Sequence, residues 1–476
     1  MSASLRNARF GRGSEAFCAD IAGLSSKESV LTYLVEQTKL RAEDHFKATR
    51  SLGLKFDEAY ESLRRAAHDR GLSNSEAALA AGLWGATQAG ATIRHCALAQ
   101  YFPASGVHRR LDELRADVLG ADAILLSGPV YFGDRGSLAQ EFIEFLREDP
   151  ACSRHVRGRV YGGITVGAKR NGGQETTLIY QMIDLANLHM LVVGNDDETT
   201  SQYGGTAVAG DVGTLAADSY GIQTSIGTGR RVARVAAMLD AGAQMATSNR
   251  STRIAIWLLQ DDVRGTGLGH FERVAADILA NLPGVEVEIS DFTSEMIYRC
   301  LACDICPTHA GDAEDYRCII SAERDLFRTR HASLIQPDAI LLAAYSPVDR
   351  SQVRSSYQRF VERTRYLRRD DYVFKNVLTA PLVVSEVDSN QNLHIRMMTS
   401  FIRHLTIVHH PVLGIEYQGA LLNRPRFTAN AIAFAQQAIR CVAGRRAIEQ
   451  PAASYQPMGY VISAEKSAAA RRPAGA

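Results

Sequence analysis

Two glycine-bearing loops contain the residues whose types and spacing could do chemistry. The first, Pro129 to Gly133, reads Pro-Val-Tyr-Phe-Gly, and the second, Lys169 to Thr176, reads Lys-Arg-Asn-Gly-Gly-Gln-Glu-Thr. Glycines let a backbone approach a ligand and offer its N–H groups, while Tyr131 and Phe132 can stack on a flat ring. The loops therefore predict a site for a planar ring with a polar edge. The alternative is that they only end strands and turn the chain.

Each loop follows a continuous apolar run that predicts a buried strand. These runs lie at Asp122 to Ser127 and at Val160 to Val166. A helical pattern at Thr177 to Leu188 and a further apolar run at His189 to Gly194 come next. Strands buried on both faces are typical of parallel sheets, which bind ligands at the carboxyl ends of their strands. Both loops are therefore expected at the same edge of a sheet.

In residue types and spacing, the two loops resemble the flavin-binding loops of the NADPH-dependent FMN reductases, a flavodoxin-like family. The resemblance implies FMN as cofactor and NAD(P)H as an electron donor, and it assigns no catalytic residue. It implies cofactor contacts from Pro129, Val130, Tyr131, Phe132, Gly133, Lys169, Asn171, Gly172, Gly173, Glu175 and Thr176.

The cofactor phosphate is expected at the first strand–helix turn, where helix N–H groups hold anions. We predict a first strand at Phe17 to Gly23, followed by a loop at Leu24 to Ser29. The candidate phosphate contacts are Ser25, Ser26 and Ser29. A later loop, Arg264 to Gly269, has more glycine and could hold a second FMN or nicotinamide phosphates, or be only a flexible turn.

Length and composition narrow the class of protein. The chain has 476 residues, which is enough for two or three domains, and its 46% hydrophobic and 22% charged residues are typical of a folded protein. A net charge of +1 gives no attraction to nucleic acid or to an anionic membrane, and no apolar run is long enough to span a bilayer. The first thirteen residues do not resemble a secretory signal. We therefore expect a cytoplasmic protein whose partners are a small-molecule substrate or a redox protein, and which can form homo-oligomers.

One pattern occurs twice, because Asp122-Ala-Ile-Leu-Leu returns as Asp338-Ala-Ile-Leu-Leu, and each run ends in Pro-Val. The second copy alternates predicted strands and helices, as a doubly wound parallel sheet does. Its five predicted strands are Arg253–Leu259, Val285–Ile289, Asp338–Ala344, Ala380–Val387 and His410–Ile415. We predict an α/β protein with two tandem flavodoxin-like sheets at 1–248 and 253–445, and a disordered tail at 446–476.

The first copy contains more helix than such a sheet needs. Several helices are predicted between Val30 and Ala91, with a capping box at Ser73 to Glu76. We interpret residues 41–87 as a helical insertion and 91–99 as the second strand. The insertion could cover the flavin or mediate assembly, or it could be purely structural.

Four cysteines form the second group of residues that could do chemistry. Cys300, Cys303 and Cys306 recur at every third residue, and Cys318 follows. Four thiolates suit an iron–sulfur cluster, and the spacing resembles that of the iron–sulfur flavoproteins, which implies a 4Fe-4S cluster. Zinc and unligated thiols are the alternatives, and the long spacing before Cys318 leaves the fourth ligand open. The isolated Cys18, Cys152 and Cys441 are expected in the core.

Each copy contains the residues for one of the two cofactors and lacks those for the other. Where the second copy has its cysteines, the first has Cys96-Ala-Leu-Ala99, which cannot hold a cluster. Where the first has its aromatic loop, the second has Pro347 to Arg350, and Glu386 to Asn390 replaces the paired glycines. We therefore expect a fused pseudo-dimer with one flavin and one cluster, acting as an FMN-dependent oxidoreductase. The alternatives are a flavodoxin-like electron carrier, a tailoring enzyme for one metabolite, and a scaffold that has lost its cofactor.

Overall fold

The structure is a computed structural model that describes most of the chain. It describes residues 1–4, 12–49, 55, 57–58, 71–103, 106–199, 202–245, 251–260, 271–303, 318–346, 353–368, 372–389 and 392–448. We refer to residues 1–245 as the first half and to residues 251–448 as the second half. Among the described residues, no helix is long and apolar enough to cross a membrane.

The second half contains a five-stranded parallel sheet. Its strands are β6 (Thr252–Gln260), β7 (Val285–Asp291), β8 (Ala339–Ser346), β9 (Leu378–Glu386) and β11 (Val412–Tyr417). They lie in the order β7-β6-β8-β9-β11, which in chain order is 2-1-3-4-5, the order of flavodoxin-type sheets. The central strand β8 is buried at every residue, whereas the edge strand β7 is only partly covered. Its helices are α10 (Phe271–Ala280), α11 (Leu326–Thr329), α12 (His331–Ile335), α13 (Ser355–Arg363), α14 (Leu393–Phe401) and α15 (Arg424–Ala447).

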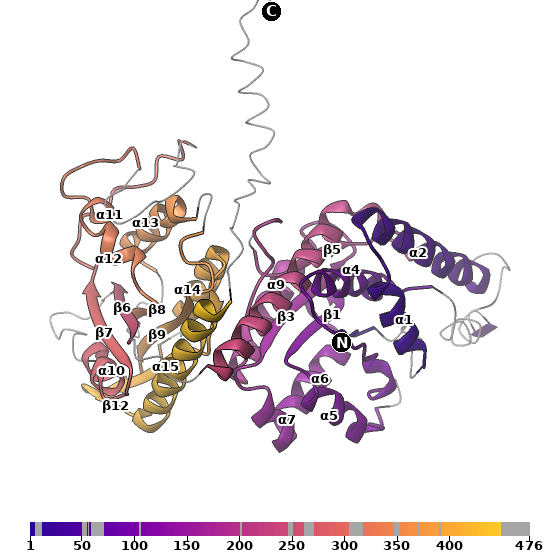
Figure 1. Ribbon diagram of the computed structural model, residues 1–476, viewed down its shortest axis with the longest axis horizontal. Helices are drawn as coiled ribbons and strands as arrows, with labels where there is room; N and C mark the ends of the chain where they lie inside the picture. The colour runs from indigo at the N-terminus through magenta and orange to yellow at the C-terminus, as the bar shows by residue number, and fades with distance from the viewer. Residues whose placement is uncertain are drawn as a thin grey trace, which may run out of the picture.

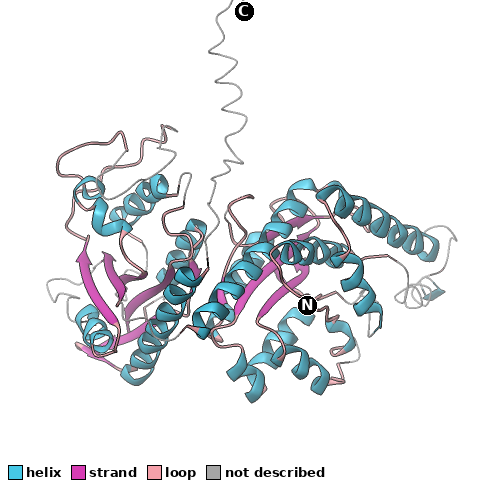
Figure 2. Ribbon diagram, in the orientation of Figure 1, coloured by secondary structure: helices cyan, strands magenta, loops and turns pink. Residues whose placement is uncertain are grey.

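The first half is built around β1 (Ala123–Tyr131) and β3 (Val160–Gly167), which are parallel neighbours. The short strands β4 (Leu191–Val192) and β5 (Gly205–Val208) both pair with β3, and β2 (Asp134–Arg135) folds back on β1. Its helices are α1 (Arg12–Ala22), α2 (Lys27–Thr49), α4 (Asn74–Gln88), α5 (Leu111–Leu119), α6 (Ser137–Glu148), α7 (Pro150–His155), α8 (Gln174–Asn187) and α9 (Ser219–Gln244). Helices α4 and α9 pack on β1 and β3 (Figures 1 and 2).

The chain's first three residues take the place of a central strand. Ser2 bridges both Ala97 and Ser127 in parallel, so Met1–Ala3 lies between β1 and the extended 92–97 segment. Together with β1, β3 and β4/β5, these pieces repeat the order 2-1-3-4-5. The predicted second strand, 91–99, is present only as this extended segment with one bridge at Ala97.

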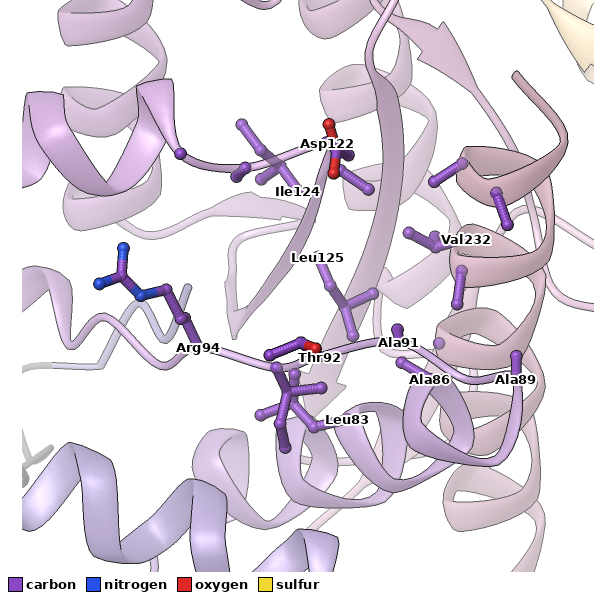
Figure 3. Close-up of a pocket in the computed structure, with 18 of the residues that line it drawn as sticks. Leu83, Ala86, Ala89, Ala91, Thr92, Arg94, Asp122, Ile124, Leu125 and Val232 are labelled. Atoms are coloured by element: carbon purple, nitrogen blue, oxygen red, sulfur yellow. The ribbon is translucent and has the colours of Figure 1, made fainter. Parts of the chain in front are cut away.

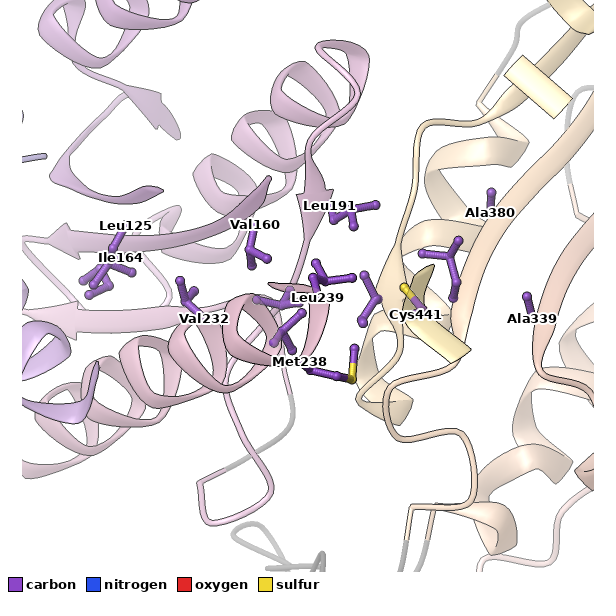
Figure 4. Packing of buried hydrophobic residues seen from close by; sticks show 14 of the residues in the cluster. Leu125, Val160, Ile164, Leu191, Val232, Met238, Leu239, Ala339, Ala380 and Cys441 are labelled. Atoms are coloured by element: carbon purple, nitrogen blue, oxygen red, sulfur yellow. The ribbon is translucent and has the colours of Figure 1, made fainter. Parts of the chain in front are cut away.

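The two halves share one continuous sheet. Strand β10 (Ile407–Val408) pairs antiparallel with β4 through Val408 and Val192, and parallel with β9. Helices α9 and α15 cross beneath this junction (Figure 1). A single hydrophobic core then extends along one face of the sheet, from Leu125 and Val232 in the first half to Cys441 and Ala380 in the second (Figure 4). The opposite face carries two cores, one under each half.

The crossing of α9 and α15 depends on two glycines. A Cβ on Gly242 would lie 2.2 Å from the carbonyl oxygen of Arg440, and a Cβ on Gly444 would lie 2.0 Å from that of Met238. The helix backbones therefore touch directly, as only glycine permits. Arg231 adds a polar contact across the boundary, because its guanidinium donates to the Leu405 carbonyl at 2.6 Å and to the Asn376 side chain.

Two predictions for the first half are wrong. The segment Phe17 to Gly23 is not a strand, because it belongs to helix α1, where Phe17 and Ile21 bury one face at helical spacing. The proposed insertion at 41–87 includes α4, which is almost wholly buried against β1 and β3 and is therefore part of the core. The extra helical material that the structure describes is α1 and α2. The capping box at Ser73–Glu76 is confirmed.

Candidate functional site

The two predicted loops meet at the carboxyl edge of the first half's sheet. Because β1 and β3 are parallel, with Pro129 opposite Val166, both chains leave the sheet side by side. A Cβ on Gly173 would lie 2.7 Å from the Cα of Gly133 and 3.3 Å from a methyl carbon of Val130. The glycine of one loop therefore packs on the glycine of the other, and a side chain there would push the loops apart.

The second loop is held by its own side chains. Gln174 accepts from the Gly172 N–H at 2.8 Å and donates to the Lys169 carbonyl at 2.8 Å, which closes the loop on itself. Thr177 donates to the Gly173 carbonyl, and Thr165 on β3 donates to that of Gln174. Gly173 caps helix α8 with a φ of +99°, a backbone conformation that favours glycine. The loop is therefore shaped before any ligand binds.

The first loop ends in an exposed aromatic tip. Phe132 is fully exposed, and Tyr131 is 57% exposed. Phe132 has a φ of +52° and Gly133 a φ of +80°, so the chain turns sharply before β2. Two large rings as exposed as these are unusual at the end of a buried strand, and they give the site a stacking surface.

Phe132→Ala is expected to weaken flavin binding without changing stability. The ring is fully exposed, so its removal leaves no cavity, whereas a lost stacking contact costs roughly 0.5–1.5 kcal/mol, or about 2- to 12-fold in affinity. Fluorescence titration with FMN measures the affinity, and thermal unfolding measures stability. Phe102→Ala is the control. That ring is buried in the core, so its loss should lower stability. Unchanged affinity in Phe132→Ala would remove this residue from the site.

Helix α4 brings a third element to the same edge. Its N-terminus is fixed by the capping box, in which Glu76 N–H donates to Ser73 Oγ and Ser73 N–H to Glu76 Oε2. Asn74 also donates to the Asp211 carbonyl in the loop after β5. A helix N-terminus beside glycine-bearing loops is a place where anions bind. Sequence alone does not reveal this element, because its capping box lies within the segment 41–87 that we interpret as an insertion.

The structure does not bring Ser25, Ser26 and Ser29 to this edge. The preceding residue, Leu24, accepts a hydrogen bond from Trp84 Nε1, ten residues beyond the start of α4 and so about 15 Å along its axis. Ser26 and Ser29 bond to each other at the start of α2. These three serines lie far from the edge because the predicted first strand is in fact helix α1. This helix leads the chain to the end of α4 that is opposite the site.

A polar cavity of about 430 Å³ borders the second loop. Arg170 spans it, donating to the Thr206 carbonyl and to Asp218, with its guanidinium 4.9 Å from the centre of the Tyr220 ring. The cavity is lined by Arg170, Asn171, Gly173, Gln174, Glu175, Thr176, Thr206 and Tyr220. Four predicted contact residues, Asn171, Gly173, Glu175 and Thr176, therefore share one cavity, while Lys169 lies exposed at the start of the loop.

The second half also reaches this region. Burial raises the pKa of Tyr203, and a hydrogen bond from Arg403 in the second half opposes that shift, while the charge of Glu175 adds to it. Met398 and Ile402 of the second half belong to the same core as Met182 on α8. The boundary between the halves therefore lies beside the helix that carries the second loop.

The described cysteines do not form a metal site. Cys300 and Cys318 are half-buried and Cys303 is exposed, and the described part of the chain contains no group of three or more His, Cys, Asp or Glu side chains that could hold a metal. Cys306, the loop Arg264–Gly269, Pro347–Arg350 and residues 449–476 lie outside the described residues. Cys152 and Cys441 are buried as predicted, whereas Cys18 is only half-buried.

Comparison with known proteins finds relatives for the part of the chain that contains both loops. The family model described as NADPH-dependent FMN reductase matches residues 68–203, which contain α4 and both loops. An NAD(P)H dehydrogenase (quinone) from Caulobacter vibrioides is 30% identical over 178 residues, covering 33% of this chain and 87% of that protein. The chain belongs to the NADPH-dependent FMN reductase family. Members of this family are flavin-dependent oxidoreductases.

Two further proteins are similar to part of the chain. "Iron-sulfur flavoprotein MJ1083" from Methanocaldococcus jannaschii is 38% identical over 130 residues, which is 27% of this chain and 66% of that protein. A solved structure, the flavodoxin, WrbA-like protein from Agrobacterium tumefaciens, is matched over 99% of its length and 42% of this chain, at 12% identity and a TM-score of 0.24.

Proposed function

We propose that this chain is an NAD(P)H-linked oxidoreductase that holds FMN in its first half, at the carboxyl edge of β1 and β3. The observation that carries the proposal is the contact between Gly133 and Gly173, because it joins the two predicted flavin loops into one cradle. Bound FMN would supply the redox chemistry, accepting a hydride from a nicotinamide and passing electrons to an acceptor.

The chain's own residues would position the cofactor. Exposed Tyr131 and Phe132 would stack on the ring, and the backbone between Lys169 and Gly173 would face its polar edge. The N-terminus of α4 would attract the phosphate. Helix α8 and its Gln174 hydrogen bonds would keep the second loop in place during turnover.

A quinone-like small molecule is the acceptor class we propose, by analogy with the relatives named NAD(P)H dehydrogenase (quinone). The second candidate function is a flavodoxin-like electron carrier that serves a partner enzyme. Phe132 is fully exposed, so a flavin ring stacked on it would also lie open at the surface. An open flavin edge suits electron transfer between proteins and therefore favours this candidate.

Two measurements separate these functions. Protein purified without air should show flavin absorbance, and the extracted flavin should be FMN by mass. Under steady-state conditions an enzyme should oxidise NADPH or NADH many times per flavin when a benzoquinone is present. A carrier would keep its flavin but show no such turnover. Protein that carries no flavin and gains none on incubation with FMN would contradict both proposals.

We also propose an iron–sulfur cluster on Cys300, Cys303, Cys306 and Cys318 in the second half. Their spacing supports it, and one relative is named an iron-sulfur flavoprotein. Protein purified anaerobically should contain about four iron and four sulfide per chain. Cys303→Ser should lose both, and Cys152→Ser, which changes a buried core thiol, should keep them. One zinc per chain with no sulfide would instead indicate a structural site. Unchanged iron in Cys318→Ser would remove that residue from the set.

The arrangement of the halves supports a tandem origin. Residues 1–248 and 253–445 would be two flavodoxin-like units whose edge strands β4 and β10 and closing helices α9 and α15 meet as in a dimer. Gly242 on α9 and Gly444 on α15 each lie against the backbone of the other helix, as equivalent residues in two copies of one unit would. In this proposal the second unit supplies Arg403 to the border of the first unit's flavin site.

A further inference from the structure

The polar cavity of about 430 Å³ lies on the side of the second loop that faces away from the first loop. Strand β3, which carries the second loop, pairs with β1 on one side and with β5 on the other. The cavity is on the β5 side, where Thr206 and Tyr220 line it, and none of the described residues 129–133 does. A ligand in this cavity would therefore lie beside bound FMN without taking its place.

One wall of this cavity is flat. The Arg170 guanidinium lies 4.9 Å from the centre of the Tyr220 ring, and its bonds to the Thr206 carbonyl and to Asp218 fix its plane. The Arg170 side chain is still 42% exposed, so it remains accessible to a ligand. Guanidinium and aromatic planes are surfaces on which nucleic acid bases stack. The wall therefore suits a purine ring.

A second cavity of the first half, of about 440 Å³, has no such wall (Figure 3). It lies between β1, α4 and α9, and Leu83, Ala86 and Val232 are among the residues that line it. No aromatic ring of the described residues lines it. Of these two cavities, only the one beside the second loop offers a place for a stacked ring.

The charges at the polar cavity decide which purine ligand fits. Asp218 offsets the charge of Arg170, and it is held in place as the N-cap residue of α9, where it accepts from the Gly221 N–H at 3.0 Å. Glu175 lines the same cavity, is exposed, and forms no ion pair with the residues that the structure describes. Lys169 does not line the cavity. One negative charge, that of Glu175, is therefore left without a partner.

We propose that this cavity holds the adenosine end of the nicotinamide donor, and that Glu175 makes NADH the preferred donor over NADPH. The inference rests on the proposed function, in which a nicotinamide reduces FMN. The adenine would stack on Arg170, and the Glu175 carboxylate would accept hydrogen bonds from the ribose hydroxyls, as acidic residues do in dinucleotide sites. The 2′-phosphate of NADPH would instead bring further negative charge to Glu175 and be repelled.

A binding measurement tests the site without turnover. AMP and its 2′-phosphorylated derivative reproduce the adenosine ends of NADH and NADPH, and both lack the nicotinamide. Calorimetry with the FMN-loaded chain should show saturable binding of AMP, and AMP should compete with NADH. The 2′-phosphorylated derivative should bind about tenfold more weakly, because of the repulsion by Glu175.

Glu175→Gln tests the choice of donor, because it removes the charge and keeps the size of the side chain. In the parent chain, kcat/KM for NADH should exceed that for NADPH by about tenfold. In the variant, KM should rise for NADH and fall for NADPH, so that the two donors come within about threefold. A merely structural role of Glu175 would change both donors alike. Glu148→Gln, the same change at an exposed position at the end of α6, should keep the preference of the parent.

Arg170→Lys tests the flat wall. Lysine keeps a positive charge beside Asp218 but has no plane on which a base can stack. The variant should bind AMP at least about fivefold more weakly and raise KM for NADH and NADPH by a similar factor, while the preference between them stays as in the parent. Flavin content is measured for every variant, and rates are expressed per bound FMN.

Three results would overturn the proposal. They are AMP that binds only after FMN has been removed or does not bind at all, a parent chain that prefers NADPH, and a Glu175→Gln variant with the preference of the parent. A chain that gives any of these results but keeps FMN and its turnover retains the proposed function and loses this inference. A chain without flavin or without turnover loses the proposed function itself, so the two failures are distinguishable.

Discussion

Gly173→Val is expected to give a folded protein that binds FMN at least 100-fold more weakly than the parent chain. Valine cannot adopt a φ of +99° without strain of about 1–3 kcal/mol. Its Cβ would also lie 2.7 Å from the Gly133 backbone, so the two loops must separate. A loss of about 2.7 kcal/mol in the free energy of FMN binding corresponds to a 100-fold change in affinity. Flavin content after purification and FMN titration of the apoprotein measure the effect.

The matched control is Gly284→Val in the second half. Gly284 also has a positive φ, +76°, but a Cβ there would contact nothing within 4 Å. It should lower stability through backbone strain while leaving flavin affinity unchanged. Gly172→Val is expected to act like Gly173→Val, because its Cβ would lie 2.7 Å from the Lys169 carbonyl. Full flavin content in both loop variants would show that the cradle lies elsewhere.

Separating the halves is the second change with a large expected effect. Residues 1–248 expressed alone should bind FMN weakly or aggregate. Without the second half, the edge of β4 is unpaired and the buried Met238 and Leu239 of α9 become exposed. Arg231 would also lose the Leu405 carbonyl that it bonds across the boundary. Light scattering and FMN titration of the fragment, compared with the whole chain, measure these losses.

A point variant tests the same boundary in the whole chain. Gly242→Leu places a side chain where the Arg440 carbonyl lies 2.2 Å away, so α9 and α15 must move apart. We expect a loss of stability of about 3 kcal/mol or more, as for severe overpacking of a core. Ala243→Leu, the next residue and exposed, should leave stability nearly unchanged. A soluble monomeric fragment with full affinity, together with a harmless Gly242→Leu, would show two independent domains.

The strands that could be predicted from the sequence are those buried on both faces. β1, β3, β8 and β9 are long apolar runs ended by turn residues, and their predicted positions agree with the structure to within a few residues. β7 could also be predicted, because Val285-Glu-Val-Glu alternates as an edge strand does. Both flavin loops follow such strands, which is why their juxtaposition could be expected.

The failures lie where local pattern does not determine position. Phe17 to Gly23 is a short apolar run, and its length alone does not separate strand from helix. The true central strand position is filled by Met1–Ala3, too short to show any period. Because this short strand cannot be predicted, α4 cannot be recognised from the sequence as the first helix of the core. The predicted phosphate contacts Ser25, Ser26 and Ser29 therefore lie at the wrong end of α4. The pairing of β4 with β10 has no local signal at all.

The junction between β4 and β10 has a consequence for synthesis of the chain on the ribosome. Val192 pairs with Val408, so the edge of β4 stays unpaired until the 408 − 192 = 216 residues that follow Val192 have been synthesised. At about 5–20 residues per second, that is roughly 10–40 s during which the edge of β4 stays open, and α9 is uncovered from its own synthesis until α15 emerges. Nascent chains stalled near residue 250 should therefore recruit chaperones or be cleaved by added protease, whereas chains stalled after release of α15 should resist both.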